Sequence, residues 1–172
     1  VGAPYSFSDG IYRSQDGGLT WQAINSGLFN SQTGYYYVPK LLVDPSNNSV
    51  MYAATSVGIF KTTNRQAANP AWSQIYPVSG GEWMRNILFE PGNPQTLYAS
   101  GVDIVRSTDG GNNWSFIARG SGLDLNGTPA APAQFPISGN NDNYMQSINI
   151  AISADNQYLY ASMMTRFDPP PY

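Results

Sequence analysis

The sequence contains neither cysteine nor histidine, and only 11% of its 172 residues are charged. Without cysteine there are no disulfides, thiolate nucleophiles or iron–sulfur clusters, and without histidine a Ser-His-Asp triad and most catalytic zinc sites are excluded. The eight Lys and Arg residues are scattered singly through a chain of net charge -3. They form no basic surface for a phosphate backbone. We therefore expect no metal, no cofactor and no nucleic-acid partner.

Long apolar runs are also missing, so we expect no membrane span. The first residues, VGAPYSFSDG, lack both the signal-peptide pattern and an initiator Met. These features lead us to expect a processed or partial form of a longer protein. The composition is poor in charge and rich in Asn, Gly, Ser and Tyr, which favours an extracellular or cell-surface location.

An internal repeat occupies most of the chain. The segment LLVDPSNNSVMYAATSVGIFKTTN begins at Leu41 and aligns with ILFEPGNPQTLYASGVDIVRSTD from Ile87, and a third copy starts near Ile148. The repeating unit predicts four short strands: an apolar run covered on both faces, a strand such as TLYAS, a strand such as GIFKT, and a strand beginning at Trp. The third copy contains the first two of these strands. Four-stranded units at a period of about 40–50 residues are typical of β-propeller blades.

The repeat predicts an all-β fold and divides the chain into segments. These are a half blade at 10–24, a blade at 36–77, a blade at 83–118, a long loop at 119–144 and a half blade at 145–164. Propellers usually close with about 4–8 blades, and the segments add up to fewer. We therefore expect an incomplete part of a larger propeller, whose remaining blades come from the same polypeptide or from another copy.

A second motif marks the turn between the third and fourth strands. SQDGGLTW at 14–21 recurs as STDGGNNW at 107–114, and a degenerate copy has Thr62, Asn64 and Trp72 at the matching positions. The Asp can accept backbone N–H bonds, the glycines supply positive φ, and the Trp can bury its ring between neighbouring sheets. The positions predicted to build these turns are Ser14, Asp16, Gly18, Trp21, Ser107, Asp109, Gly111 and Trp114.

These turns resemble the Asp-box, or BNR, repeat, whose pattern is S-x-D-x-G-x-T-W. The first turn fits throughout, whereas Asn113 replaces Thr in the other. The flanking strands are similar to those of sortilin-type receptors, xyloglucan-cleaving endoglucanases and secreted bacterial BNR-repeat proteins. In these families the Asp-box lies on the rim away from the ligand face. The resemblance therefore implies that Asp16 and Asp109 are structural, rather than catalytic or calcium-binding.

Asp-box propellers include glycoside hydrolases, which place two carboxylates beside the scissile bond. The carboxylates outside the turn motifs and the repeated Asp/Glu-Pro turns are Asp9, Glu82, Asp103, Asp124, Asp142 and Asp168. None lies in a recognisable catalytic signature, so we predict no catalytic residue. A hydrolase of plant-type or cell-surface polysaccharide, with its acids partly outside this segment, stays open as the alternative.

The connections from a fourth strand into the next blade each end in an aromatic residue: Tyr37, Trp83 and Tyr144. In propellers these connections lie on the face where ligands usually bind. The rings could stack on sugars or anchor a peptide, or they could pack against neighbouring loops. The leading hypothesis is a non-catalytic extracellular interaction or structural module that binds a protein or glycan ligand.

Overall fold

The computed structural model describes residues 10–28, 37–78, 83–118 and 144–166, and every regular element among them is a β-strand. The strands are β1 (Tyr12–Arg13), β2 (Gln22–Ala23), β3 (Lys40–Val43), β4 (Met51–Thr55), β5 (Gly58–Thr62), β6 (Ser73–Pro77), β7 (Asn86–Glu90), β8 (Asn93–Ser100), β9 (Ile104–Ser107), β10 (Ser115–Ala118), β11 (Tyr144–Ile152) and β12 (Leu159–Arg166). Within this described part, no helix is long and apolar enough to cross a membrane.

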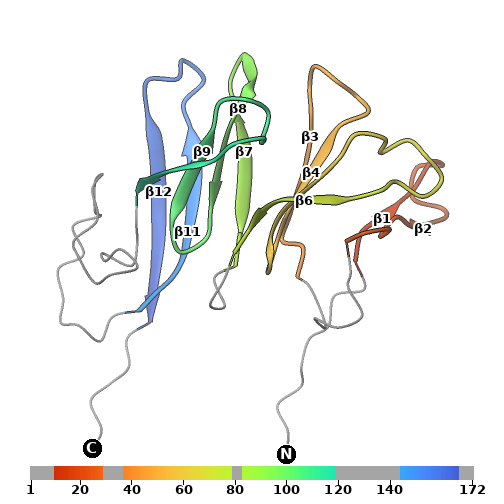
Figure 1. The fold of residues 1–172 in the computed structure, drawn as a ribbon, viewed down its shortest axis with the longest axis horizontal. Coiled ribbons are helices and arrows are strands. Elements are labelled where there is room, and N and C mark those ends of the chain that lie inside the picture. Colours follow the sequence, from red (N-terminus) through yellow and green to blue (C-terminus); the bar gives the residue numbers. More distant parts are fainter. Residues whose placement is uncertain (1–9, 29–36, 79–82, 119–143, 167–172) are drawn as a thin grey trace, which may run out of the picture.

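The strands form four antiparallel sheets that follow the chain order. Two sheets have four strands, β3-β4-β5-β6 and β7-β8-β9-β10, and two have only two strands, β1-β2 and β11-β12. Figure 1 shows the sheets side by side in sequence order, with β1-β2 at one end of the row and β11-β12 at the other. Sheets that are consecutive in the sequence are therefore adjacent in space.

The repeats adopt the same register in both complete sheets. Tyr52 lies opposite Lys61 in the pair β4–β5, and Tyr98 lies opposite Arg106 in the pair β8–β9. Because successive side chains of a strand point to opposite faces, each middle strand packs against both neighbouring sheets. This register makes the sheets equivalent units.

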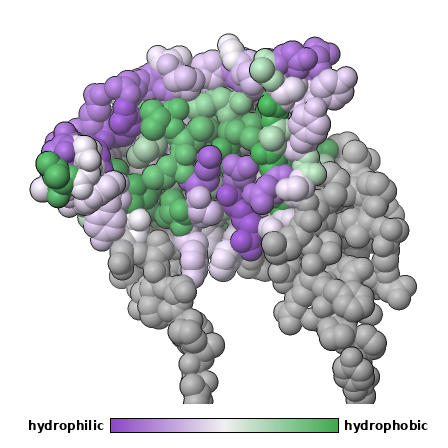
Figure 2. All heavy atoms as spheres, turned by 180° about the vertical axis from the view of Figure 1, so that it is seen from behind, coloured by the Kyte–Doolittle hydropathy of each residue, from purple (hydrophilic) through white to green (hydrophobic). Residues whose placement is uncertain are grey.

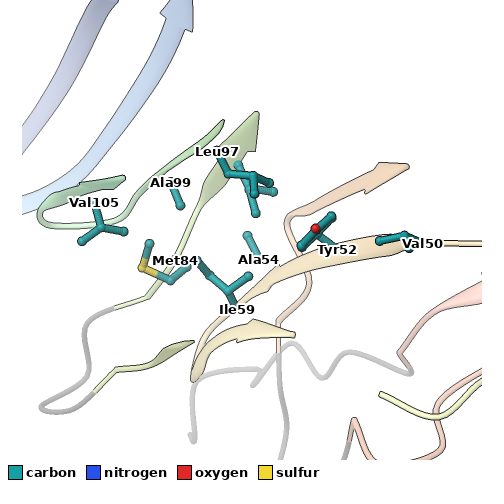
Figure 3. Packing of buried hydrophobic residues seen from close by; sticks show 9 residues of the cluster. Val50, Tyr52, Ala54, Ile59, Met84, Leu97, Ala99 and Val105 are labelled. Carbon is teal, nitrogen blue, oxygen red and sulfur yellow. The ribbon is translucent and has the colours of Figure 1, made fainter. Parts of the chain in front are cut away.

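Three apolar clusters fill the spaces between adjacent sheets. The cluster in Figure 3 joins the two four-stranded sheets through Val50, Tyr52, Ala54, Ile59, Met84, Ile87, Leu97, Ala99 and Val105. A second joins Ile11, Ile24 and Leu28 of the β1-β2 side to Met51, Ala53, Phe60 and Trp72. A third places Ile148 and Ile150 of β11 against Ile104. Both complete sheets are therefore covered on both faces.

The strand β3 is more exposed than the sequence predicted. Its apolar run suggested a strand covered on both faces, but Leu41 is 40% and Val43 is 42% exposed. These side chains lie on the face toward β1-β2, which has only two strands, whereas Ile87, the equivalent of Leu41 on β7, is buried against the complete sheet β3-β4-β5-β6. Figure 2 shows the molecule from behind, and apolar residues gather there in a hollow bordered by hydrophilic ones.

Candidate functional site

The turn between β1 and β2 is held by a closed set of short hydrogen bonds. The Ser14 hydroxyl donates to Asp16 Oδ1 over 2.8 Å and accepts the Gly18 N–H over 2.7 Å. Asp16 Oδ1 also accepts the Thr20 N–H at 2.9 Å, and Oδ2 accepts the Thr20 hydroxyl at 2.5 Å. The Trp21 indole N–H donates to the Gly18 carbonyl at 3.1 Å. Both carboxylate oxygens are thus used within the turn.

The turn between β9 and β10 repeats this pattern with Asn113 in place of Thr20. Ser107 donates to Asp109 Oδ1 at 2.8 Å and accepts the Gly111 N–H at 2.9 Å. The Asn113 N–H donates to Asp109 Oδ1 at 2.8 Å, and its side-chain amide donates to Oδ2 at 2.6 Å. The Trp114 indole donates to the Gly111 carbonyl at 3.0 Å. The amide therefore replaces the hydroxyl without loss of a bond to the carboxylate.

These hydrogen bonds keep both carboxyl groups ionised. Donation from the side chain of Thr20, then from its backbone, lowers the pKa of Asp16 to about 2. Donation from the Asn113 side chain and then its backbone lowers the pKa of Asp109 to about 2 as well. A carboxyl group with such a low pKa carries no proton near neutral pH, so it is unsuited to act as a general acid.

The degenerate turn between β5 and β6 uses an amide in place of the carboxylate. The Thr62 hydroxyl donates to Asn64 Oδ1 at 2.8 Å, and the Ala71 N–H donates to the same oxygen at 3.1 Å. The Trp72 indole instead donates to the Ile24 carbonyl of the neighbouring segment at 2.7 Å. The Asn64 amide oxygen therefore joins the two ends of this longer turn, as the Asp16 carboxylate joins the two ends of the turn between β1 and β2.

The burial of the turn tryptophans differs from the prediction in one case. Trp72 is buried, and Trp114 packs at the edge of the cluster between the complete sheets. Trp21, which the motif also predicted to be buried, is 63% exposed. Each Trp packs toward the sheet that precedes it, and no strand precedes β1 among the described residues. The sheet position, rather than the motif, decides the burial of this ring.

A stacked aromatic pair lies at the opposite end of the sheets from the Ser-Asp turns. Tyr37 precedes β3, and its carbonyl accepts the N–H of Ser56 in the β4–β5 turn at 2.9 Å. Trp83 precedes β7 and stacks on Tyr37, with ring centroids 5.1 Å apart and planes inclined by 21°. The Arg85 guanidinium lies over the Trp83 ring at 5.2 Å. The two rings, predicted separately from their spacing, therefore form one cluster.

The third predicted aromatic is not part of this cluster in the described structure. Tyr144 begins β11 and pairs through its backbone with Arg166, but its side chain lies outside the described residues. The predicted long loop at 119–144 lies almost entirely outside them as well. The Tyr37–Trp83 contact was not evident from the sequence, because the rings are 46 positions apart and meet only when two sheets are side by side.

Carboxylates outside the turn motifs give little basis for a catalytic centre in the described part. Of the six candidates only Asp103 is described, and the other five lie outside the described ranges. Asp44 is buried, and its Oδ1 accepts three hydrogen bonds from Ser46 and Asn47, which hold the turn between β3 and β4. Within the described ranges no three acidic residues cluster as a metal site would require.

Comparison with known proteins gives likeness of structure only. The sequence matches no known family, and it matches no curated protein. Among solved structures, an ancestral GH74 enzyme matches 92% of the chain with a TM-score of 0.54 and 18% identity. A GH74 enzyme from Niastella koreensis matches 72% of the chain with a TM-score of 0.46 and 25% identity. The chain spans only 25% and 16% of these two proteins, respectively.

The fold class predicted from the repeats is confirmed. The described part of the chain is an all-β partial propeller, built from two four-stranded and two two-stranded antiparallel sheets that stand side by side. It resembles part of a much longer GH74 enzyme. The two four-stranded sheets are blades of this propeller. Because fold does not determine activity, the likeness by itself gives the chain no substrate.

Proposed function

We propose that the chain is a non-catalytic interaction module that binds carbohydrate or protein through the end of the blades carrying Tyr37 and Trp83. The observation that carries this proposal is the stacked pair itself. Trp83 is 37% exposed although it contacts both the Tyr37 ring and the Arg85 guanidinium. A large ring that stays accessible beside a cationic donor is suited to a ligand with both apolar faces and hydroxyl groups.

The backbone around the pair supports its use as a rigid platform. The Tyr37 N–H donates to the Ser56 hydroxyl at 3.0 Å, and the Arg85 N–H donates to the Ser100 carbonyl at 2.7 Å. A Cβ added to Gly101 would lie 2.1 Å from the Trp83 carbonyl oxygen, so the backbones of these two residues pack closely against each other. A ring fixed in this way loses little conformational entropy when a ligand stacks on it.

We also propose that the Ser-Asp turns are Asp-box repeats with a purely structural role. Their closed hydrogen bonding and lowered pKa values support this assignment. The same proposal divides the chain into a half blade at 10–24, blades at 36–77 and 83–118, and a half blade at 145–164. It places the protein outside the cell or on its surface, in keeping with the low charge and the absence of cysteine.

The binding hypothesis can be tested with one matched pair of variants. Soluble xyloglucan and a panel of cell-surface glycans and peptides would be screened, and any hit measured by titration calorimetry. Trp83→Ala is expected to weaken binding at least about tenfold, because a central aromatic anchor commonly contributes more than 1.4 kcal/mol. Trp21→Ala removes a more exposed ring at the other end of the blades and is expected to leave affinity unchanged. Equal losses in the two variants, or no binding to any probe, would refute the proposal.

The alternative function is that of a glycoside hydrolase, and its support is the likeness to the ancestral GH74 enzyme. A release of reducing ends from xyloglucan by the chain would favour this alternative. Asp9→Ala and Asp142→Ala variants would then show whether either residue is a catalytic acid, because loss of an essential carboxylate lowers the rate by orders of magnitude. Undiminished activity in both would remove these two residues as catalysts.

A further inference from the structure

The described cationic side chains differ in whether the protein itself supplies an oxygen atom to them. Most of them contact a carbonyl, an amide oxygen or a carboxylate of the chain. These contacts are Arg13 to the carbonyls of Arg65 and Ala67, Lys61 to the Gly110 carbonyl, Arg65 to Asn48 Oδ1 and Arg106 to Glu90. Among the described residues, the Lys40 ammonium and the Arg85 guanidinium have no such oxygen partner, and the Arg85 guanidinium lies over the Trp83 ring instead. These two cations are therefore available to a ligand.

Lys40 and Arg85 face each other's sheets across the junction between the two complete blades. Lys40 is exposed and lies opposite Ala54, so both side chains are on the face of their sheet that packs in the apolar cluster between the blades. Arg85 lies two residues before Ile87, which packs in the same cluster from the other sheet. The position of the Arg85 guanidinium over Trp83 agrees with this orientation. Both cations therefore border the junction that holds the stacked aromatic pair, and a complete sheet lies on each side of it.

The acidic residues are concentrated at the other end of the blades. Asp103 lies in the turn between β8 and β9, at the same end as Trp83. The other described acidic residues lie in or beside turns at the opposite end: Asp16, Asp44, Glu90, Asp109 and Asp155. Because like charges repel, an anionic ligand is disfavoured at the end of the Ser-Asp turns and is favoured beside Lys40 and Arg85. This distribution of charge indicates that a ligand at Trp83 carries negative charge.

The backbone at this junction offers little to an extended peptide. Extended peptides commonly bind through main-chain hydrogen bonds along a free strand edge. The Tyr37 N–H donates to the Ser56 hydroxyl, and the Tyr37 carbonyl accepts the Ser56 N–H. The Arg85 N–H donates to the Ser100 carbonyl. Recognition therefore depends on side chains, namely two aromatic rings and two cations. A sugar ring with a carboxylate matches this set, because its C–H groups pack on an aromatic ring and its carboxylate accepts hydrogen bonds from cations.

We propose that the ligand of the Tyr37–Trp83 pair is an acidic polysaccharide, whose uronic acid units place their carboxylates between Arg85 and Lys40. This inference rests on the proposed function, because it names the ligand class of the same site. The exposed part of the Trp83 ring contacts the C–H groups of a sugar, and the planar Arg85 guanidinium donates to its carboxylate. Lys40 adds a point charge from the other blade. A neutral sugar makes the aromatic contact alone, so carboxylated chains bind more tightly than neutral ones.

Matched pairs of polysaccharides test the role of the carboxylate. Polygalacturonate, alginate and glucuronoxylan are each titrated into the unmodified chain, beside a sample whose carboxyl groups have been reduced to alcohols. At low salt, at least one acidic form is expected to bind about tenfold more tightly than its reduced form, because hydrogen bonds to charged groups commonly contribute this much. High salt is expected to narrow the difference, because it screens exposed charges.

Two variants remove the cations one at a time. Arg85→Gln is expected to weaken binding of the acidic form about tenfold and to leave the affinity for the reduced form unchanged. Lys40→Gln is expected to weaken binding of the acidic form about threefold, because an exposed ion pair contributes less. The matched control is Arg106→Gln, which removes the same charge from a side chain that pairs with Glu90. This control is expected to leave both affinities unchanged.

The possible results separate this inference from the proposed function. If the acidic and reduced forms bind equally and Trp83→Ala weakens both, the proposed function stands and the inference about the carboxylate is overturned. Equal losses in Arg85→Gln and Arg106→Gln would also overturn it, because binding would then follow net charge. Poly-glutamate that binds as tightly as the preferred polysaccharide would overturn the ligand class. No binding to any glycan or peptide would refute both proposals.

Discussion

The two Ser-Asp turns offer a direct test of how the blades pack. Gly18 and Gly111 occupy the same position of the motif and both have positive φ, at 97° and 88°. A Cβ at Gly18 would meet only the Trp21 ring, at 3.8 Å. A Cβ at Gly111 would lie 2.7 Å from Ile75 Cδ1, on the preceding blade. An alanine at the second site therefore meets an additional obstacle across a blade junction.

The expected magnitudes follow from these geometries. An L-residue in the left-handed region costs about 1–2 kcal/mol, and this cost is common to both sites. Forcing one extra methyl group into packed side chains adds about 1–3 kcal/mol. We expect Gly18→Ala to lower the free energy of unfolding by about 1 kcal/mol, because the reduced entropy of the unfolded chain offsets part of the strain. We expect Gly111→Ala to lower it by about 2–4 kcal/mol.

Urea unfolding measures the difference in stability between the two variants. Linear extrapolation gives the free energy of unfolding of each variant. Ile75→Val removes the Cδ1 atom that the new methyl group meets. The double variant Gly111→Ala/Ile75→Val is therefore expected to lose about 1 kcal/mol less than the sum of the single variants.

Two results would refute this reasoning. If Gly18→Ala destabilises the chain as much as Gly111→Ala, the cost arises from the turn backbone and not from the junction. If the losses in free energy of unfolding caused by Gly111→Ala and Ile75→Val simply add in the double variant, Ile75 is not the side chain that the new methyl group meets. Either result would mean that the blades do not pack at this turn as the structure shows them.

Two further predictions concern the same turns. Tyr52→Phe is expected to lower the free energy of unfolding by about 1 kcal/mol, because the buried Gly110 carbonyl loses a hydrogen bond; an unchanged urea midpoint would contradict a contribution of this bond. The pKa values of Asp16 and Asp109 are lowered from 3.8 to about 2, so these groups contribute stability that is present above pH 3.8 and is lost as the pH falls through about 2. The difference in urea midpoint between the chain and its Asp16→Asn/Asp109→Asn variant should shrink over this range, and a difference that grows toward low pH would reverse the assignment.

Local features of the fold could be predicted because they depend on neighbours in the sequence. The hydrogen bonds of Asp16 and Asp109 join residues within four positions of the carboxylate, so an eight-residue motif is sufficient to specify them. The strands of each blade are joined by short turns and follow the repeat in the same way. Features that join two blades were predicted less well. The exposure of Trp21 and Val43 and the stacking of Tyr37 on Trp83 all depend on which sheet lies alongside.

The sequence by itself determined the all-β class, the four-stranded repeat and the hydrogen-bonded turns, since periodicity and turn chemistry act over a few residues. It also excluded thiol, imidazole and disulfide chemistry through the residues that are missing. Only the tertiary structure decided that Gly111 is confined by Ile75 while Gly18 is open, although the two turns share the same Ser, Asp and Gly residues. The physical reason is that burial and contact between blades depend on the arrangement of residues far apart in the chain.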